Sequence, residues 1–229
     1  MTYRAPRQLS SPTALEWPQM SIRARTFLTP LAGALLLTLA ACSSEPAALE
    51  KKEAAKPPEP ITGQSALYKM YQVARSQWAP DAQVLKLDSM HLAEVPEVPG
   101  KAPAWEATFT SANLSRSRTY TYSVIEEQPN LHQGVFAGNE ENFSGSRGVT
   151  KPFPIAAVKI DTDAAYQTAH AKAADYEKKN PGKPITILLE NNDRFPDPAW
   201  RIIWGESVGT SSFSVFVDAS TGAYLETMH

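Results

Sequence analysis

The sequence has little of what usually assigns a function directly. Its single cysteine in 229 residues excludes an internal disulfide, a cysteine-based zinc finger and a cysteine-held iron–sulfur cluster. The 22 basic and 24 acidic residues balance to a net charge of −2, which leaves no broad basic field for nucleic acid. There is no phosphate-binding loop and no dinucleotide fingerprint, so we expect no nucleotide cofactor.

Nor is there an apolar run long enough for a transmembrane helix. The longest is residues 27–41, whose 15 residues would rise about 22 Å as a helix, short of the ~30 Å hydrocarbon core. Arg23 and Arg25 precede it, and small residues end it. A basic start, a short apolar middle and a small-residue end predict a secretory signal segment.

The signal segment ends in Leu39-Ala-Ala-Cys42, which resembles the bacterial lipobox. That resemblance implies that Cys42 becomes the first mature residue and is acylated, which anchors the protein in a membrane. The alternative is a buried free cysteine, but a polar, proline-rich stretch follows at once. Ser43, in place of an aspartate, favours the outer membrane facing the periplasm, by similarity to the Gram-negative sorting rule.

Charge supports anchoring by acyl chains. Residues 1–41 contain four arginines and one glutamate, so the mature chain keeps 18 basic and 23 acidic residues, a net charge of −5. An anionic chain is not held on anionic lipid or DNA by charge. Residues 1–19 have no clear period, which favours Met20 as the start of translation; a genuine long region before the signal is the alternative.

Composition divides the rest of the chain into three parts. Residues 42–61 hold the lipidated cysteine and a tether rich in proline, alanine, glutamate and lysine, which cannot bury enough apolar surface to fold. We expect a first folded unit over residues 62–145 and a second over residues 150–229. The polar, glycine-rich stretch 134–150 is interpreted as the boundary between them.

Each unit is predicted to be a helix followed by three antiparallel strands. In the first unit, apolar residues at helical spacing predict a helix over 65–78, and alternation predicts strands near 85–87, 105–109 and 118–125. In the second unit the same criteria predict a helix over 163–179, strands near 185–189, 200–204 and 213–217, and a short last strand at 223–227. The fold class is therefore α+β.

Similarities between the halves predict an internal duplication. Pro103-Ala-Trp105 recurs as Pro198-Ala-Trp200, 95 positions later. Tyr120, Tyr122 and Val124 are aligned with Phe213, Val215 and Val217 at an offset of 93. The alternative is two unrelated α+β segments whose strands look alike.

The second half also resembles a PepSY domain over about residues 155–228. The residues that carry the resemblance are the alanine-rich helix, the Asn180-Pro-Gly182 stop, Trp200-Arg-Ile-Ile-Trp204 and the ending Phe216-Val-Asp-Ala-Ser-Thr-Gly222. In the first half, Ile125-Glu-Glu-Gln-Pro-Asn130 replaces that ending. The resemblance implies binding of an envelope partner or restraint of a peptidase, and it brings no catalytic residues.

Two patterns that could indicate catalysis have simpler interpretations. Gly205-Glu-Ser-Val-Gly209 matches a hydrolase elbow with Ser207 as the nucleophile, and Asp218 and His229 follow in the order of a triad. The segment lies between two expected strands, so we interpret it as a hairpin loop, and Asp218 as a turn residue that accepts backbone N–H bonds. The sequence thus predicts no catalytic residue and no enzyme.

Ligand sites are equally weakly indicated. The amide- and acid-rich residues Asn191, Asn192, Asp193 and Asp197 could hold calcium, but the EF-hand spacing and glycine are missing, so a polar loop is favoured and no metal is expected. The four histidines, His91, His132, His170 and His229, show no ligand pattern. The aromatic residues Trp105, Phe109, Trp200 and Trp204 could line a ligand groove but are interpreted as core.

These observations favour a non-enzymatic, lipid-anchored envelope protein that binds a protein or peptide partner. Strand addition at an exposed sheet edge is the expected mode of binding. The alternative function is a lipoprotein that senses a small ligand or a metal.

Overall fold

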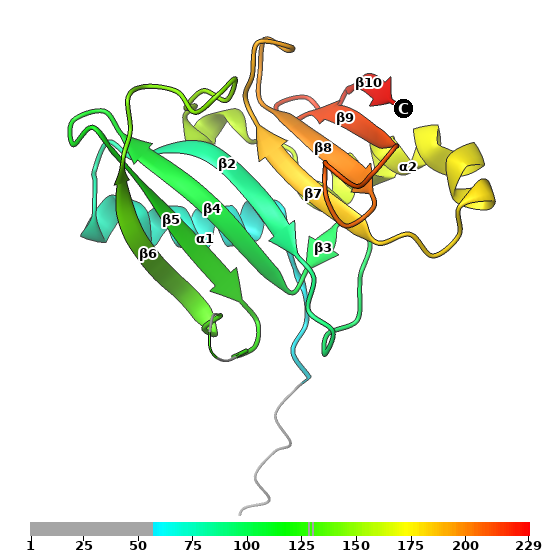
Figure 1. The fold of residues 1–229 in the computed structure, drawn as a ribbon, viewed down its shortest axis with the longest axis horizontal. Helices are drawn as coiled ribbons and strands as arrows, with labels where there is room; N and C mark the ends of the chain where they lie inside the picture. The colour runs from blue at the N-terminus through cyan, green and yellow to red at the C-terminus, as the bar shows by residue number, and fades with distance from the viewer. Residues whose placement is uncertain (1–56, 128, 130) are drawn as a thin grey trace, which may run out of the picture. The chain divides into compact units, whose positions relative to one another are not determined.

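An eight-stranded antiparallel sheet with two helices on one face forms the part of the chain that this computed structural model describes, residues 57–127, 129 and 131–229 (Figure 1). The signal segment, Cys42 and the tether up to residue 56 lie outside the described residues. In chain order the elements are β1 (Ile61–Thr62), α1 (Gly63–Gln77), β2 (Gln83–Met90), β3 (Lys101–Ala102), β4 (Ala104–Ser111), β5 (Arg116–Ser123), β6 (Gly134–Asn142), a 3₁₀ turn (Ile155–Ala157), α2 (Thr162–Lys179), β7 (Ile185–Glu190), β8 (Ala199–Trp204), β9 (Ser214–Asp218) and β10 (Tyr224–Met228).

The large sheet has the strand order β10-β9-β8-β7-β2-β4-β5-β6. Each helix is therefore followed by four strands that pair in succession, and the first strands of the two sets, β2 and β7, pair at the centre. A two-stranded sheet of β1 and β3 lies apart from it. The expected α+β class is confirmed, as are both helices and the strands predicted from alternation.

The stretch 134–150, interpreted from sequence as a boundary, contains β6, so that interpretation is wrong for residues 134–142. β6 has few apolar residues because it is the last strand of the sheet and most of its residues are half-buried or exposed. Period-two alternation is weak in such a strand, since little of either face is buried. The first half consequently contributes four strands to the large sheet, one more than predicted.

The alignment of the third predicted strands is also wrong, by two residues. Trp105 pairs with Tyr122 and Trp200 pairs with Val217, so Tyr122 and Val217 occupy equivalent places, 95 positions apart. A shift of two residues leaves a strand's alternation unchanged, and the sequence pattern therefore could not detect it.

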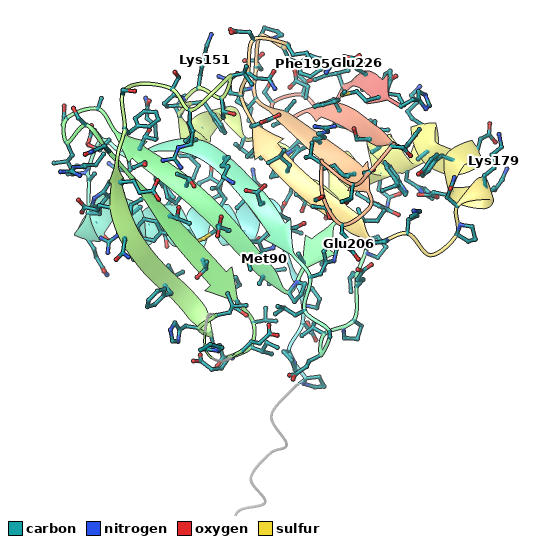
Figure 2. The ribbon with its side chains drawn as sticks, in the orientation of Figure 1. Met90, Lys151, Lys179, Phe195, Glu206 and Glu226 are labelled. Atoms are coloured by element: carbon teal, nitrogen blue, oxygen red, sulfur yellow. The ribbon has the colours of Figure 1, made fainter. Side chains whose placement is uncertain are left out.

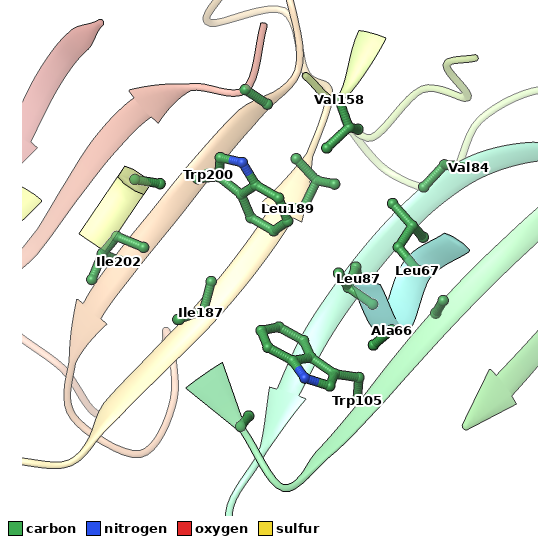
Figure 3. Packing of buried hydrophobic residues seen from close by; sticks show 14 of the residues in the cluster. Ala66, Leu67, Val84, Leu87, Trp105, Val158, Ile187, Leu189, Trp200 and Ile202 are labelled. Atoms are coloured by element: carbon green, nitrogen blue, oxygen red, sulfur yellow. The ribbon is translucent and has the colours of Figure 1, made fainter. Parts of the chain in front are cut away.

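Both helices cover the same face of the sheet, the rear face in Figure 1, and one hydrophobic cluster joins them to it. The buried residues of α1 and α2 recur 99 positions apart: Ala66 with Ala165, Met70 with Ala169, and Ala74 with Ala173. Strand residues 105, 109, 200 and 204 complete this core, each no more than 2 % exposed, which confirms their assignment as core. Figure 3 shows Trp105 and Trp200 within the cluster.

Each half ties one tryptophan to the residue that precedes its helix. The Trp105 indole N–H donates to the Ile61 carbonyl at 3.1 Å, and the Trp200 indole N–H donates to the Ile160 carbonyl at 2.9 Å. These bonds satisfy buried polar groups at the two helix starts, where the chain turns onto the sheet.

The two helix N-termini also meet. Asp161, the N-cap of α2, accepts from the backbone N–H of Thr162 at 2.7 Å and from that of Gln64 in α1 at 3.0 Å. The Thr162 hydroxyl accepts from the Gly63 N–H at 2.8 Å. One carboxylate thus caps both helices, as expected of an acid at the positive end of a helix dipole. Among the described residues, neither helix is long and apolar enough to cross a bilayer.

Candidate functional site

The outer edge of β6 is the longest strand edge of the sheet that is left without a partner. β6 has nine residues and pairs on one side with β5; within the described residues no other strand pairs with it. Phe136, its third residue, is 47 % exposed. The His132 ring lies 4.6 Å from the Phe136 ring, centroid to centroid, which lengthens the apolar surface beside the edge.

Register shows which backbone groups face outward. The Val124 N–H donates to Pro103 beyond β4, so the even-numbered residues of β5 face β4 and the odd-numbered ones face β6. Thr121 is opposite Phe136, and Tyr122 is opposite Val135. It follows that Phe136 bonds to β5, whereas the N–H and C=O of Val135 and Ala137 point away from the sheet.

The opposite edge of the sheet, β10, is a shorter edge for a further strand to pair with. It has five residues, and its pairing with β9 is interrupted by an irregularity between Tyr224 and Glu226. The same register argument places the backbone groups of Thr227 on its outer side. The pairing of β6 with β5 has a similar irregularity between Ala137 and Glu140, so the two edges differ in length: a five-residue strand is a poorer template for a further strand than a nine-residue one.

The hydrolase-like pattern forms a loop, as predicted. Ser207 lies between the neighbouring antiparallel strands β8 and β9, not in a strand–turn–helix elbow. Its hydroxyl hydrogen-bonds the Thr210 hydroxyl at 2.9 Å. Asp218 also has the role expected from sequence: its Oδ1 accepts from the N–H groups of Ser220 at 2.7 Å and Thr221 at 2.9 Å.

The environment of Asp218 sets its ionisation. Burial alone would raise its pKa, but hydrogen bonds from Ser220 and Thr221 to the carboxylate outweigh burial, so the pKa lies below its ordinary value. Gly222 follows with φ of +77°, the left-handed conformation that glycine adopts most easily. The turn between β9 and β10 is therefore held by a charged residue that acts structurally.

Three of the four histidines contact carboxylates, which the sequence did not indicate. His91 lies 3.0 Å from Glu97, His132 lies 2.9 Å from Glu126, and His170 lies 2.9 Å from Glu177. His91 also contacts the Thr186 hydroxyl at 3.0 Å and borders a pocket of about 220 Å³ beside the proline-rich loop. His170 is exposed, as expected for a residue beside the helix stripe.

The amide- and acid-rich loop, interpreted from sequence as a polar loop rather than a calcium site, makes contacts within the protein. Asn192 accepts from the Arg194 backbone N–H at 2.9 Å, and Asp193 pairs with Lys151. Within the described residues, no three histidine, cysteine, aspartate or glutamate side chains are grouped so that they could hold a metal ion. Cys42, the predicted lipidation site, lies outside the described residues, so its acylation stays a prediction.

Compared with known proteins, the chain matches no protein-family model, no curated protein and no solved structure. The PepSY resemblance therefore stays a prediction from short motifs. The sequence also missed two candidate features: the β6 edge, and Arg201 between two buried tryptophans in β8. A lone charge at the centre of an otherwise apolar strand is the signal that could have identified Arg201.

Proposed function

We propose that this chain is a non-enzymatic, lipid-anchored protein of the cell envelope that binds an extended segment of a partner protein or peptide along β6. The observation that carries the proposal is the nine-residue outer edge of β6, where Val135 and Ala137 direct backbone donors and acceptors away from the sheet. Strand addition uses such groups, because a partner strand satisfies them and extends the sheet.

Cys42 and the tether explain how the edge would be presented. Acylated Cys42 would hold the chain at the outer membrane, facing the periplasm, and the proline-rich stretch after it would keep the folded part clear of the lipid surface. Because a tethered edge is confined near one surface, its effective concentration toward an envelope partner is high.

We further infer that the folded part is a tandem duplication of two PepSY-like units. Several equivalences support this: the alanine stripes at an offset of 99, the paired strands at an offset of 95, and the tryptophan-to-carbonyl bond at each helix start. By the PepSY resemblance, the partner would be a peptidase or another envelope protein, held in an inhibited or docked state.

A photo-crosslinking residue placed at Phe136 in intact cells tests the proposed edge. We expect a discrete adduct with one partner protein. The adduct should disappear when Val135→Pro removes an outward N–H, because proline cannot donate to an added strand, while the inward bonds to β5 are kept. Thr227→Pro makes the same change at the β10 edge and should leave the adduct unchanged.

Two results would contradict the proposal. One is an adduct at Phe136 that survives Val135→Pro, because binding would then not use the strand edge. The other is the same protein captured equally by a crosslinker at Tyr224, which is 40 % exposed on the opposite edge.

Replacement of Cys42 by alanine tests the anchor separately. Fractionation of the membranes should find the unmodified chain in the outer membrane and the variant absent from it. A variant that still reaches the outer membrane would show that acylation at Cys42 is not the anchor.

A further inference from the structure

Arg201 lies at the centre of the helix-free sheet face in the second half. Its neighbours in β8, Trp200 and Ile202, point into the core under α2, so the alternation of the strand places Arg201 on the opposite face. It is half-buried there and lies directly across from Phe216 of β9. The guanidinium carbon is 5.1 Å from the centroid of the Phe216 ring.

The guanidinium of Arg201 has few protein partners. Its Nε–H donates to the Ser214 hydroxyl at 3.0 Å, and Nη2 has only the Met228 sulfur, at 3.8 Å. Among the residues that the structure describes, no carboxylate forms an ion pair with it. Because a guanidinium carries five N–H donors, Nη1 and part of Nη2 remain available.

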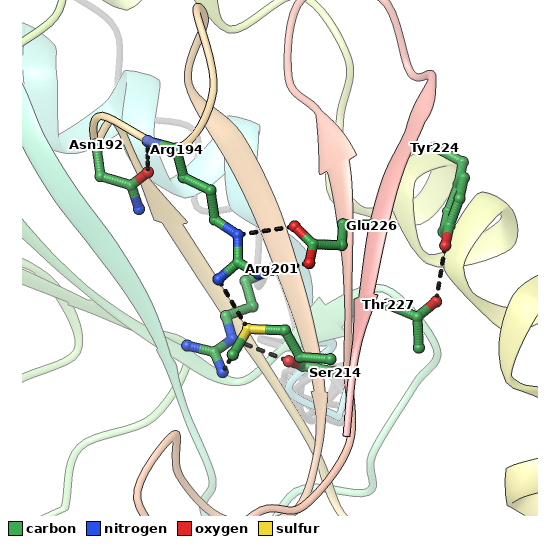
Figure 4. A network of polar contacts seen from close by, with 8 residues as sticks. Asn192, Arg194, Arg201, Ser214, Tyr224, Glu226 and Thr227 are labelled. Atoms are coloured by element: carbon green, nitrogen blue, oxygen red, sulfur yellow. Dashed lines mark hydrogen bonds and ion pairs between the residues drawn. The ribbon is translucent and has the colours of Figure 1, made fainter.

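Arg194, the other arginine on the Phe216 ring, provides a direct contrast. Its Nε and Nη2 donate to the two oxygens of Glu226 at 2.8 and 2.5 Å, a bidentate pair (Figure 4). Figure 2 labels Phe195 and Glu226, which lie at the same end of the second half as Arg194. Hydrogen bonding to Glu226 raises the pKa of Arg194. By contrast, burial lowers the pKa of Arg201, with the nearby charge of Glu190 opposing and that of Arg194 adding to the effect.

A pocket of about 440 Å³ opens beside this unpaired charge. The lining includes the hydroxyl-bearing residues Ser212 and Ser214, the apolar residues Val208 and Met228, and His229. The Ser214 hydroxyl accepts from Arg201, so its own proton is free to point toward a ligand. A half-buried cation beside hydroxyls and apolar walls has the composition of a small-ligand site.

We propose that the pocket at Arg201 binds a carboxylate group attached to a small apolar body, either a free carboxylic acid or the C-terminal residue of a peptide. The planar fork of arginine matches the two oxygens of a carboxylate. A single unpaired guanidinium balances one negative charge, which suits a carboxylate better than a doubly charged phosphate. The site is independent of strand addition at β6, which lies at the other edge of the sheet.

Methyl NMR of the full lipidated protein in nanodiscs, with labelled methionine methyl groups, tests the site. The Met228 methyl reports on the pocket, and the buried Met70 methyl in the first half is the internal control. The probes are butyrate, acetyl-Ala-Ala-Val with a free carboxylate, the same peptide as its C-terminal amide, and inorganic phosphate. We expect both carboxylates to shift the Met228 signal saturably, and the amide and phosphate to leave it unmoved.

Substitutions at Arg201 complete the test. Arg201→Gln should weaken carboxylate binding about tenfold or more, and Arg201→Lys should weaken it less, because lysine keeps the charge and loses the fork. Arg75→Gln, on the exposed side of α1, is the matched control and should change nothing. Tighter binding of the peptide would identify a chain terminus as the ligand, and tighter binding of butyrate would identify a free acid.

Thermal unfolding separates a binding role from a structural one. Arg201→Met should leave Tm unchanged or raise it by about 2–4 °C, because a half-buried charge without a carboxylate is replaced by an apolar side chain. A lower Tm for this variant would assign Arg201 a structural role. Equal binding of the amide or of phosphate, or unchanged binding by Arg201→Gln, would also overturn the proposal.

Discussion

The two halves of the sheet are arranged alike but filled differently. In both, an indole N–H holds the carbonyl before the helix and alanines let the helix approach the sheet. In the first half the helix carries the larger of the two equivalent helix side chains, Met70, and the facing strand carries Phe109. In the second half Ala169 stands at the helix position and Trp204 at the strand position.

At this pair of positions, a larger helix side chain in the first half is exchanged for a larger strand side chain in the second. Protein cores tolerate such exchanges when volume and patterning are kept. The halves also differ at their edges, where β6 is nine residues long and β10 is five. The two halves therefore share the architecture of their cores, and the differences most relevant to binding lie at the edge strands β6 and β10.

We expect the largest loss of stability from substitutions of Trp105 and Trp200, which occupy equivalent places in the two halves. Trp105→Ala and Trp200→Ala should each lower the free energy of unfolding by about 3–5 kcal/mol, because each empties a fully buried site and leaves a helix-start carbonyl without its donor. Urea unfolding measures both. A large loss for one variant and none for the other would break the equivalence of the halves.

The next effect tests the exchange of volume between helix and strand. Met70→Ala should cost about 2–5 kcal/mol, because it leaves a cavity, whereas Ala169→Met should cost about 1–3 kcal/mol, because it overfills a packed site. Denaturant unfolding of the two variants gives both numbers. If Ala169→Met were neutral, the second half would contain unfilled space at this site. The side-chain volume at this pair of helix and strand positions would then not be conserved between the halves.

Smaller losses of stability are expected at the turns that follow β5 and β9. Asp218 and Ser123 are equivalent, since each pairs with the first residue of the preceding strand, and Ser123 holds its turn with a neutral hydroxyl bonded to Ile125. Asp218→Ala should cost about 1–2 kcal/mol at pH 7, and Ser123→Ala about 0.5–1.5 kcal/mol.

Only the Asp218 contribution should depend on pH. Its folded pKa is lowered, so its charge stabilises the fold above the unfolded pKa of about 3.9, and that contribution is lost as pH falls through the folded pKa. The stabilities of Asp218→Ala and the unmodified chain should converge in acid, as thermal scans from pH 7 to pH 3 would show. A gap that stays constant would mean that the charge contributes nothing.

The smallest effect is expected at the edges. Val135→Pro and Thr227→Pro each remove an outward N–H, so each should change the free energy of unfolding by less than about 1 kcal/mol. Phe136→Pro removes an inward N–H and should cost about 3 kcal/mol. Similar losses for Val135→Pro and Phe136→Pro in thermal unfolding would refute the assigned register of β6.

The sequence predicted the long elements that have a buried face, and the long strand that it missed, β6, has no buried residue. Alternating apolar residues located β2, β4, β7 and β8, and helical spacing located both helices, because burial imposes those periods. β6 has little burial and thus little pattern. The pairing of β2 with β7 and the contacts of Arg201 depend on residues far apart in the sequence, which periodicity does not report.

Hydrogen–deuterium exchange at β6, with the crosslinked partner purified and added back, tests the central claim most directly. If the partner adds a strand, the amide hydrogens of Val135 and Ala137 should become protected on binding while that of Thr227 exchanges at its original rate. If those two amides exchange equally fast with and without the partner, the β6 edge is not where the partner binds.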